Sequence, residues 1–312
     1  MMSSSSKMIE KLKQGIQGLE KVSEVKKDGT DEILPYLMDD LTPALIEEAR
    51  TTLKETDEIR PKALEELREL LKNEKNLITP VDDIFLLSFL RARKFNVKKA
   101  FKLIQNYWSF RNEYRHIYDT SEIQPVLDML YRNCIGFLPY RDRQGRVVVI
   151  CKIGMWDPSV DTYEVLFRTA TAILIFSMQL SATQIAGYRV IFDTRGLSWK
   201  QLKMCTPSNI ILLIRSTQYC FPGRYKAFHV IAESKLFQIG WAIVYPLLTA
   251  KLKKRFMLHG SDLSPLLDYI HPEVLPEEFG GKAAPFCNDS WKEIIDENIE
   301  KVLDMLNYGY KD

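Results

Sequence analysis

Two regions of the chain differ in how hydrophobic and polar positions alternate. From about residue 41 to 131, apolar residues recur every three or four positions, which is the spacing of amphipathic helices. From about residue 146 onward, short runs of β-branched residues alternate with long apolar segments, which is typical of strands joined by helices. We therefore predict a helical N-terminal lobe followed by an α/β lobe.

The N-terminal lobe is expected over residues 41–131, after a peripheral extension of residues 1–40. Thr42 before Pro43 indicates a helix start, because threonine caps free backbone N–H groups and proline suits the first helical position. Further helices are predicted near residues 60–72, 82–91 and 97–115. Together these elements indicate a helical bundle.

The α/β lobe is expected over residues 132–285, followed by a C-terminal helix over residues 286–312. Asp161 and Glu164 resemble a capping box at the start of a helix, and Pro207 begins another helical piece. Strands that alternate with helices are joined by right-handed crossovers and form a mostly parallel sheet. The predicted strands cover residues 147–150, 188–192, 228–232 and 255–259, and the predicted helices cover residues 161–183, 199–219 and 235–253.

Two of the predicted helices are apolar on nearly all sides. The stretches Ala172–Phe176 and Ile210–Ile214 contain no polar residue. Such helices are either buried on more than one side or have one side facing a lipid-filled cavity. Near the N-terminus, apolar residues from Ile9 to Val22 also recur at helical spacing. That segment is either a surface helix of its own domain or a helix that binds a partner or a membrane.

Composition restricts the class of protein. Of the 312 residues, 46% are hydrophobic and 27% charged, which is ordinary for a soluble globular protein. The net charge of +2 gives no indication of a nucleic-acid partner. Neither a signal peptide nor an uninterrupted apolar run of membrane-spanning length is evident. The five cysteines are widely spaced, so we expect reduced thiols and a cytoplasmic location.

No catalytic signature stands out. The sequence has no phosphate-binding P-loop, no GxSxG nucleophile motif and no HExxH zinc motif. His229 lies in an apolar strand, where we expect a hydrogen-bonded core histidine. We therefore predict a binding protein rather than an enzyme, with no catalytic residue and no metal site.

The segment from Ser234 to Arg255 combines an apolar stretch with a basic end. About fifteen nearly apolar residues precede Lys251, Lys253, Lys254 and Arg255. One interpretation is a mobile helix that covers a hydrophobic cavity and lies on a membrane, its basic end meeting anionic headgroups. The other is a buried crossover helix with a solvated basic end. Pro246 is expected to bend the helix in either case.

Two further basic clusters occur elsewhere in the chain. Six lysines and arginines lie between Arg91 and Lys102 with no acidic residue among them, and Arg224 and Lys226 stand at the entrance to a strand. Three separate clusters could converge into a site for a polyphosphorylated headgroup. Each could equally be a solvated face, and the sequence alone does not decide between these interpretations.

Several motifs in fixed order resemble the CRAL-TRIO lipid-transfer family, in the branch of the alpha-tocopherol and retinaldehyde carriers. The resemblance covers roughly residues 78–281. It rests on FLLSFLRARKFNVKKAFKLIQNYWSFR, WDP, VIFDTRGLSW, FPGRYKAFHVIAES, YPLLTAKLKKRFMLHG and HPEVLPEEFGG. It implies a sheet that floors a hydrophobic cavity, closed by a mobile gate helix near residues 232–250. The implied ligand is a hydrophobic lipid, with no other cofactor.

The resemblance also implies site residues. Positions that bind phosphoinositide headgroups in this branch correspond to Arg93, Lys102, Arg224, Lys226, Lys251 and Arg255. Gate positions correspond to Phe237, Trp241, Val244, Leu247 and Leu248. Cavity positions correspond to Phe167, Ala170, Thr171, Leu174, Tyr188, Phe192, Cys205, Leu213, Ser216, Thr217 and Phe228. The tocopherol carriers have serines where Ala170 and Leu174 stand, so this wall is more apolar and tocopherol itself is in doubt. Thr171, Ser216 and Tyr188 remain for one ligand hydroxyl.

We expect an intracellular carrier that encloses one terpenoid lipid, of tocopherol or retinoid type, and exchanges it at membranes containing phosphoinositides. The protein would be cytoplasmic and peripherally associated with membranes. A phospholipid exchanger of the phosphatidylinositol-transfer type is the alternative within the family. A lipid-sensing adaptor with residues 9–22 as its partner helix is the alternative outside it, although no protein partner is identified.

Overall fold

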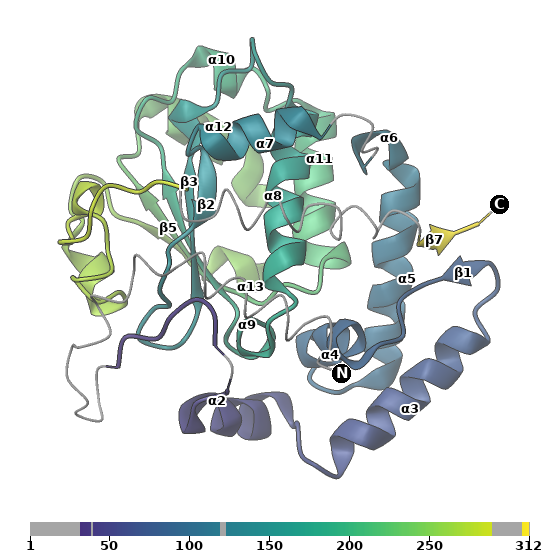
Figure 1. The fold of residues 1–312 in the computed structure, drawn as a ribbon. Helices are drawn as coiled ribbons and strands as arrows, with labels where there is room; N and C mark the ends of the chain where they lie inside the picture. Colours follow the sequence, from purple (N-terminus) through teal and green to yellow (C-terminus); the bar gives the residue numbers. More distant parts are fainter. Residues whose placement is uncertain (1–31, 39, 119–122, 289–307, 312) are drawn as a thin grey trace.

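The computed structural model describes residues 32–38, 40–118, 123–288 and 308–311. Its centre is a five-stranded sheet in the order β2-β3-β4-β5-β6 (Figure 1). Strand β2 is antiparallel to β3, and the other neighbouring strands are parallel. The strands are β2 (Ile135–Phe137), β3 (Val147–Lys152), β4 (Tyr188–Asp193), β5 (Tyr225–Ile231) and β6 (Phe256–Leu258).

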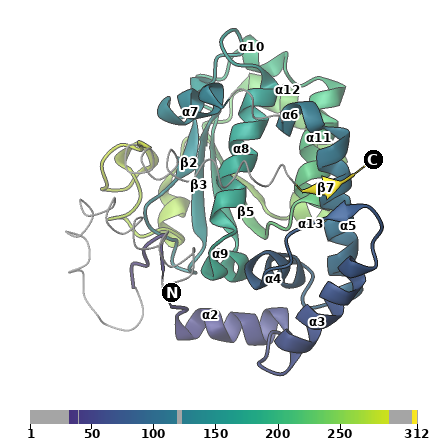
Figure 2. The ribbon, with the colours of Figure 1, turned by 45° about the vertical axis from the view of Figure 1, so that its right-hand side comes forward.

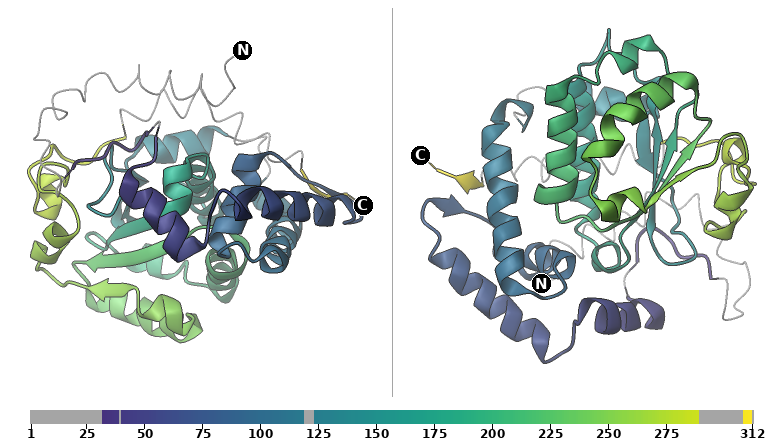
Figure 3. Two further views of the ribbon diagram at one scale, coloured as in Figure 1. Left: turned by 90° about the horizontal axis from the view of Figure 1, so that it is seen from below. Right: turned by 180° about the vertical axis from the view of Figure 1, so that it is seen from behind.

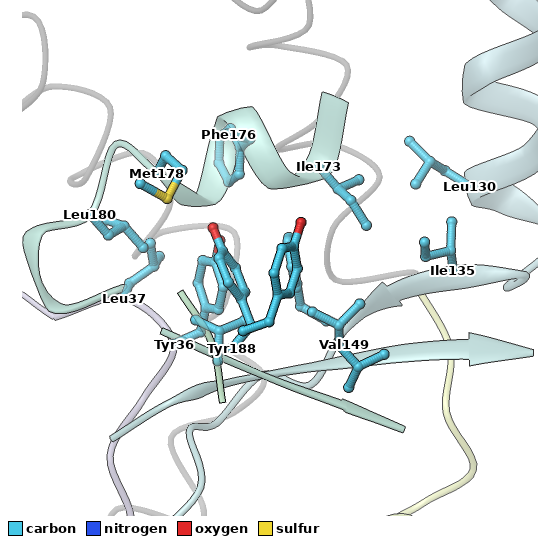
Figure 4. Packing of buried hydrophobic residues seen from close by; sticks show 14 of the residues in the cluster. Tyr36, Leu37, Leu130, Ile135, Val149, Ile173, Phe176, Met178, Leu180 and Tyr188 are labelled. Atoms are coloured by element: carbon cyan, nitrogen blue, oxygen red, sulfur yellow. The ribbon is translucent and has the colours of Figure 1, made fainter. Parts of the chain in front are cut away.

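The two faces of the sheet are covered differently. Val147 and Val149 of β3 join one buried cluster, whereas Val148 and Ile150 join another, as the two-residue repeat of a strand requires. Figure 4 shows the first cluster, in which Tyr188 of the sheet points toward Phe176 of the helix above it. The helices on that face are α8 (Tyr163–Ser177), α9 (Ser181–Ala186) and α11 (Pro207–Arg215).

The opposite face is closed by the last part of the α/β lobe. This segment lies across the sheet from α8 and α11 in both Figure 1 and Figure 2. It contains the short 3-10 helices η6 (Ser264–Asp268) and η7 (Glu277–Phe279), whose Leu266 and Phe279 are fully buried. The remaining pieces are η3 (Ile153–Met155), α10 (Trp199–Leu202), η4 (Ser216–Cys220), α12 (Lys235–Val244), η5 (Tyr245–Leu247) and α13 (Ala250–Lys253).

The N-terminal lobe is helical and has its own core. Leu67, Leu86 and Trp108 from three different helices are fully buried there. Strand β1 (Leu77–Ile78) pairs with β7 (Gly309–Tyr310), so the end of the chain returns to this lobe beside α5 (Figure 3). The helices are α2 (Pro43–Glu48), η2 (Ala49–Leu53), α3 (Ile59–Lys72), α4 (Asp83–Ala92), α5 (Val97–Glu113), α6 (Arg115–Tyr118) and α7 (Gln124–Tyr131).

A buried arginine joins the two lobes. Arg91 of α4 donates to both carboxylate oxygens of Glu55, at 2.8 and 2.7 Å. The same guanidinium donates to the side-chain oxygen of Gln184 in α9, at 2.6 Å. Gln184 in turn donates to the carbonyls of Ile84 and Met178. Because every partner is paired, this charge is tolerated in the interior and fixes α4 against α9.

A second buried arginine lies within the α/β lobe. Arg189 of β4 donates to Asp142 at 2.6 Å and contacts Nε2 of His229 at 2.5 Å. His229 Nδ1 lies 2.8 Å from Nε2 of His259. Burial, followed by the charges of Arg189, His259 and Arg146, lowers the pKa of His229 to about 3. His229 is therefore a neutral, hydrogen-bonded core histidine, as expected from the sequence.

The two-lobe α/β architecture predicted from the sequence is confirmed, and several boundaries differ. The capping box at Asp161 is wrong, because the cap of α8 is Thr162, whose hydroxyl accepts from the Val165 N–H. Asp161 pairs instead with Arg132. The helix expected over residues 161–183 ends at Ser177, and α9 is separate.

The helix expected over residues 235–253 is divided into α12, η5 and α13. Pro246 lies at the break, where its missing N–H and its ring prevent the helix from continuing. Strand β2 was not expected, since three residues are too few to show a periodicity. Strand β5 begins three residues earlier than predicted, at Tyr225. The helix predicted from Ile9 to Val22 and most of the C-terminal helix predicted over residues 286–312 lie outside the described residues.

Candidate lipid-binding wall and basic cluster

The expected cavity positions lie on elements that cover one face of the sheet. Ala170 and Leu174 of α8 and Phe228 of β5 are partly buried and pack against the cluster of Figure 4. Phe192 shares this face of β4 with Tyr188 and Val190, because alternate residues of a strand point the same way. The structure therefore brings α8, β4 and β5 positions together into one apolar wall.

The other cavity positions differ in exposure. Phe167 and Tyr188 are buried in cores, whereas Leu213 on α11 is 41% exposed. Cys205, Ser216 and Thr217 are intermediate, as is Thr171. Leu213 thus keeps part of its apolar surface exposed, as a residue that a ligand can contact would.

Helix α12 is apolar but contains no buried residue. Lys235 is its one charged residue, yet Ile239 and Ile243 are nearly half exposed. The helix approaches α10 closely at Gly240, where an added Cβ would lie 3.1 Å from a methyl carbon of Leu202. Helix α12 therefore leaves much of its apolar surface in contact with solvent.

Aromatic rings connect α12 to the sheet. Trp241 of α12 lies 4.7 Å from Phe256 of β6, and Phe256 stacks on Phe228 of β5 at 4.5 Å. Phe237 stacks on Trp241 at 5.8 Å. Of the remaining gate positions, Val244 is partly buried, Leu247 is half exposed and Leu248 is buried. Trp241 thus contacts a ring that stacks on Phe228 of the wall, whereas Leu247 is half exposed.

Hydroxyl groups near the wall donate their protons within the protein. Thr171 donates to the carbonyl of Phe167 at 2.9 Å. Ser216 and Thr217 both donate to the carbonyl of Leu213, at 2.9 and 2.7 Å. Tyr188 lies 2.6 Å from Ser177, whose hydroxyl donates to the carbonyl of Leu174. What these oxygens still offer is acceptor capacity, so they suit a ligand that donates a hydrogen bond.

Basic residues from distant segments meet near α13. The pKa of Lys251 is lowered by burial and then by the charges of Arg255, Arg93, Lys94 and Arg224. Like charges disfavour the protonated form only when they lie close to it. The basic residues of α4, α13 and the start of β5 therefore converge, and Figures 1 and 2 show α4 and α13 at the same end of the molecule.

Local backbone geometry places several of these cations. Lys94 and Phe95 have positive φ angles of 52° and 57°, so the turn after α4 is tight and carries Arg93 and Lys94. Gly187, with a φ of 86°, lets the backbone at Arg224, just before β5, approach the start of β4 closely. A Cβ at position 187 would lie 2.1 Å from the Arg224 carbonyl oxygen. Thr249 caps α13, which carries Lys251.

Arg146 joins the cluster although the sequence did not single it out. Burial lowers the pKa of Arg255, and the charge of Arg146 lowers it further. The pKa of Lys226 is lowered by burial, by Arg224 and by Arg146, whereas its contact with Glu48 raises it. The Nε of Arg146 is buried and has no hydrogen-bond partner among the described residues. Nothing in the local sequence distinguishes Arg146 from Arg141, which is buried against Tyr36 and Thr183.

The predicted headgroup residues are therefore mostly brought together. Lys102 differs, because it is exposed on α5 and is not among the charges that act on Lys251. We call the following seven residues the basic cluster: Arg93, Lys94, Arg146, Arg224, Lys226, Lys251 and Arg255.

One carboxylate lies among these cations. Oε1 of Glu48, at the end of α2, lies 2.8 Å from the Lys226 ammonium and 3.2 Å from a terminal nitrogen of Arg224. The other terminal nitrogen of Arg224 is buried without a hydrogen-bond partner among the described residues. Arg255 donates to the carbonyl of Tyr225. The cluster thus keeps a strong excess of positive charge, which favours an anion from outside.

In the part of the chain that the structure describes, none of the helices is long and apolar enough to span a bilayer. No group of three or more histidine, cysteine or acidic side chains is placed to hold a metal ion there. The five cysteines, all within the described ranges, are free thiols.

Comparison with known proteins decides the family. The CRAL/TRIO domain family matches residues 131–281, from the end of α7 to just past η7. The alpha-tocopherol transfer protein-like protein of Homo sapiens is 34% identical over 256 residues, which are 82% of this chain and 75% of that protein. The chain belongs to the CRAL-TRIO family.

The chain is also similar to a further relative and to a second domain family. Clavesin-1 of Mus musculus is 30% identical to this CRAL-TRIO protein over 265 residues, which are 84% of the chain and 75% of that relative. A second family, the Pinta-like, UBA domain, matches residues 56–125 in the helical lobe. Among solved structures, the crystal structure of Sfh5 aligns at a TM-score of 0.47 and 14% identity, covering 96% of this chain and 100% of that one. Lipid binding and transfer is the activity class of the family.

Proposed function

We propose that this CRAL-TRIO protein carries one hydrophobic terpenoid that bears a hydroxyl group, and that it exchanges this lipid at membranes containing phosphoinositides. The observation that carries the proposal is the continuity of α12 with the basic cluster. An apolar helix without a buried residue leads, within a few residues, to Lys251 and Arg255. Headgroup binding and displacement of the helix would therefore involve one continuous segment.

The apolar wall supports a water-insoluble ligand. A terpenoid that buries about 400 Å² of apolar surface gains roughly 10 kcal/mol on leaving water, at about 25 cal/mol per Å². Release into water would be slow, so an acceptor membrane is needed. Half-exposed apolar residues of α12, such as Ile239 and Ile243, would enter the acyl boundary while the basic cluster contacts headgroups.

The hydroxyl groups of the wall support a ligand that donates a hydrogen bond. Thr171, Ser216 and Thr217 use their protons on backbone carbonyls, so their oxygens accept. The relatives include proteins named for alpha-tocopherol transfer. Ala170 and Leu174 stand where tocopherol carriers are expected to have serines, which favours a terpenoid with a less polar ring end.

The coupling between headgroup and gate is tested by a lipid-transfer assay between vesicles. Lys251→Gln combined with Arg255→Gln is expected to reduce transfer to acceptors containing phosphatidylinositol bisphosphate by about 30-fold, because each surface cation contributes about 1 kcal/mol. Retention of the bound ligand in buffer should not change, since neither residue lies on the wall.

The matched control is Lys72→Gln combined with Lys75→Gln, which removes the same charge from exposed positions at the end of α3. That variant should transfer lipid at the wild-type rate. Equal wild-type rates with and without phosphoinositide in the acceptor would refute the coupling. Native mass spectrometry followed by extraction identifies the ligand: a terpenoid alcohol agrees with the proposal, whereas a phospholipid makes the protein a phospholipid exchanger.

A further inference from the structure

We propose that Glu48 is a built-in competitor of the headgroup phosphates, which sets the affinity and selectivity of the basic cluster. This inference rests on the proposed function and adds a residue that limits it. A phosphate that reaches Arg224 and Lys226 has to displace the Glu48 carboxylate from both.

The position of the carboxylate carries the argument. A single oxygen of Glu48 contacts Arg224 and Lys226 together, so it occupies the place that a bridging phosphate oxygen would take. The side chains of Glu48, Arg224 and Lys226 are only 23%, 12% and 19% exposed. Partial burial reduces screening, so the contact is stronger than an ion pair at the open surface.

Charge balance points the same way. Among the described residues, Glu48 is the one carboxylate that forms an ion pair with any member of the basic cluster. The other five members, Arg93, Lys94, Arg146, Lys251 and Arg255, form no ion pair within the described part of the chain, so they remain available to an external anion while Glu48 stays in place. The cluster is thereby divided into an open part and a part that Glu48 covers.

This division affects selectivity. A singly charged lipid headgroup can neutralise part of the open cations but has little to gain from expelling a carboxylate of equal charge. A headgroup with several phosphates has charge enough for both parts, because phosphates carry more negative charge and more acceptor oxygens than a carboxylate. Glu48 is therefore expected to suppress binding to ordinary anionic membranes.

Glu48 is held in place by contacts that do not depend on its charge. Leu45, on the same helix, is buried against Ala182, Ile185 and Ala186 of α9. Thr42 caps the start of α2 by accepting from the Leu45 N–H. Replacing the carboxylate by an amide should therefore leave α2 docked, and the effect on binding can be measured in a folded protein.

Flotation with vesicles tests the inference. Vesicles contain either phosphatidylinositol 4,5-bisphosphate or phosphatidylserine at equal total charge. Glu48→Gln should bind both kinds of vesicle about three- to tenfold more tightly than wild type. The gain should be larger on phosphatidylserine, so the preference for the bisphosphate over phosphatidylserine should fall. Affinity should also depend more steeply on salt, because more cations are free to exchange counterions.

Glu47→Gln is the matched control, since Glu47 is the neighbouring exposed carboxylate and pairs with Arg50 away from the cluster. It should bind like wild type. Equal binding by the Glu48 and Glu47 variants would overturn the inference, and weaker binding by Glu48→Gln would show instead that Glu48 positions Arg224 and Lys226. If wild type itself does not prefer the bisphosphate vesicles, the proposed function fails, and this result is distinct from either outcome.

Discussion

Arginines in the interior and arginines of the basic cluster have very different surroundings. Arg91 and Arg189 are almost fully buried, and each meets a carboxylate and a further hydrogen-bond acceptor. Among the described residues, Glu48 is the one carboxylate that pairs with the basic cluster, and it contacts only Arg224 and Lys226. A charge deep in a protein must be paired for the chain to fold, whereas water and salt stabilise an unpaired charge near the surface. Pairing therefore indicates which cations support the fold and which are free to bind.

The largest change in stability is expected on replacing Glu55, which pairs with Arg91. Glu55→Gln leaves a buried guanidinium without its counter-charge and should lower the free energy of unfolding by about 3–5 kcal/mol. Urea denaturation followed by circular dichroism measures the change. Glu58→Gln removes an exposed carboxylate that pairs with Lys62 and should unfold close to wild type. If both variants unfold at the same urea concentration, the interior pair is not structural.

The second test uses the pH dependence of stability. Folded His229 stays neutral down to about pH 3, because burial and the charges of Arg189, His259 and Arg146 oppose its protonation. In the unfolded chain a histidine takes up a proton near pH 6.5. Below that pH the unfolded state therefore binds more protons. Stability should fall as the pH falls from about 6.5 toward 3, by at most about 1.4 kcal/mol per unit for this one group.

Urea midpoints measured across this pH range would show the slope. His229→Gln should have a shallower slope than wild type, although it is less stable at pH 7. His116→Gln changes an exposed histidine and is expected to keep the wild-type slope. His259 and His271 also have lowered pKa values through burial, so part of the slope should remain in the His229 variant. An unchanged slope in His229→Gln would contradict the structural role assigned to this histidine.

The smallest effects should separate members of the basic cluster from cations outside it. Arg146→Gln should weaken binding to bisphosphate vesicles about fivefold, since its charge acts on Arg224, Lys226 and Arg255. Lys102→Gln should weaken it by less than about twofold, because Lys102 is exposed elsewhere on α5. Flotation measures both. A larger effect at Lys102 than at Arg146 would mean that Lys102, and not Arg146, belongs to the headgroup site.

Much of the fold follows from local patterns. The β-branched run at Val147–Ile150 and the Thr42-Pro43 helix start were visible because strand periodicity and capping depend on neighbouring residues. The interruption of α12 followed from Pro246. By contrast, the sequence does not predict β2, because its three residues pair with β3 in a register that no local pattern shows. The cap of α8 was misplaced by one residue for a similar reason: Asp161 and Thr162 are both suitable, and the Arg132 contact draws Asp161 away.

The site was predicted less completely than the fold. By itself, the sequence determined the two lobes, the parallel sheet, an apolar segment ending in basic residues, and the identity of most cations in the cluster. Only the tertiary structure decided that these cations meet, that Arg146 belongs with them while Lys102 does not, and that Glu48 contacts Arg224 and Lys226. Helices and strands are fixed by interactions between near neighbours in the chain. The ion pair between residues 48 and 224 depends instead on how α2 docks on α9, which no periodicity records.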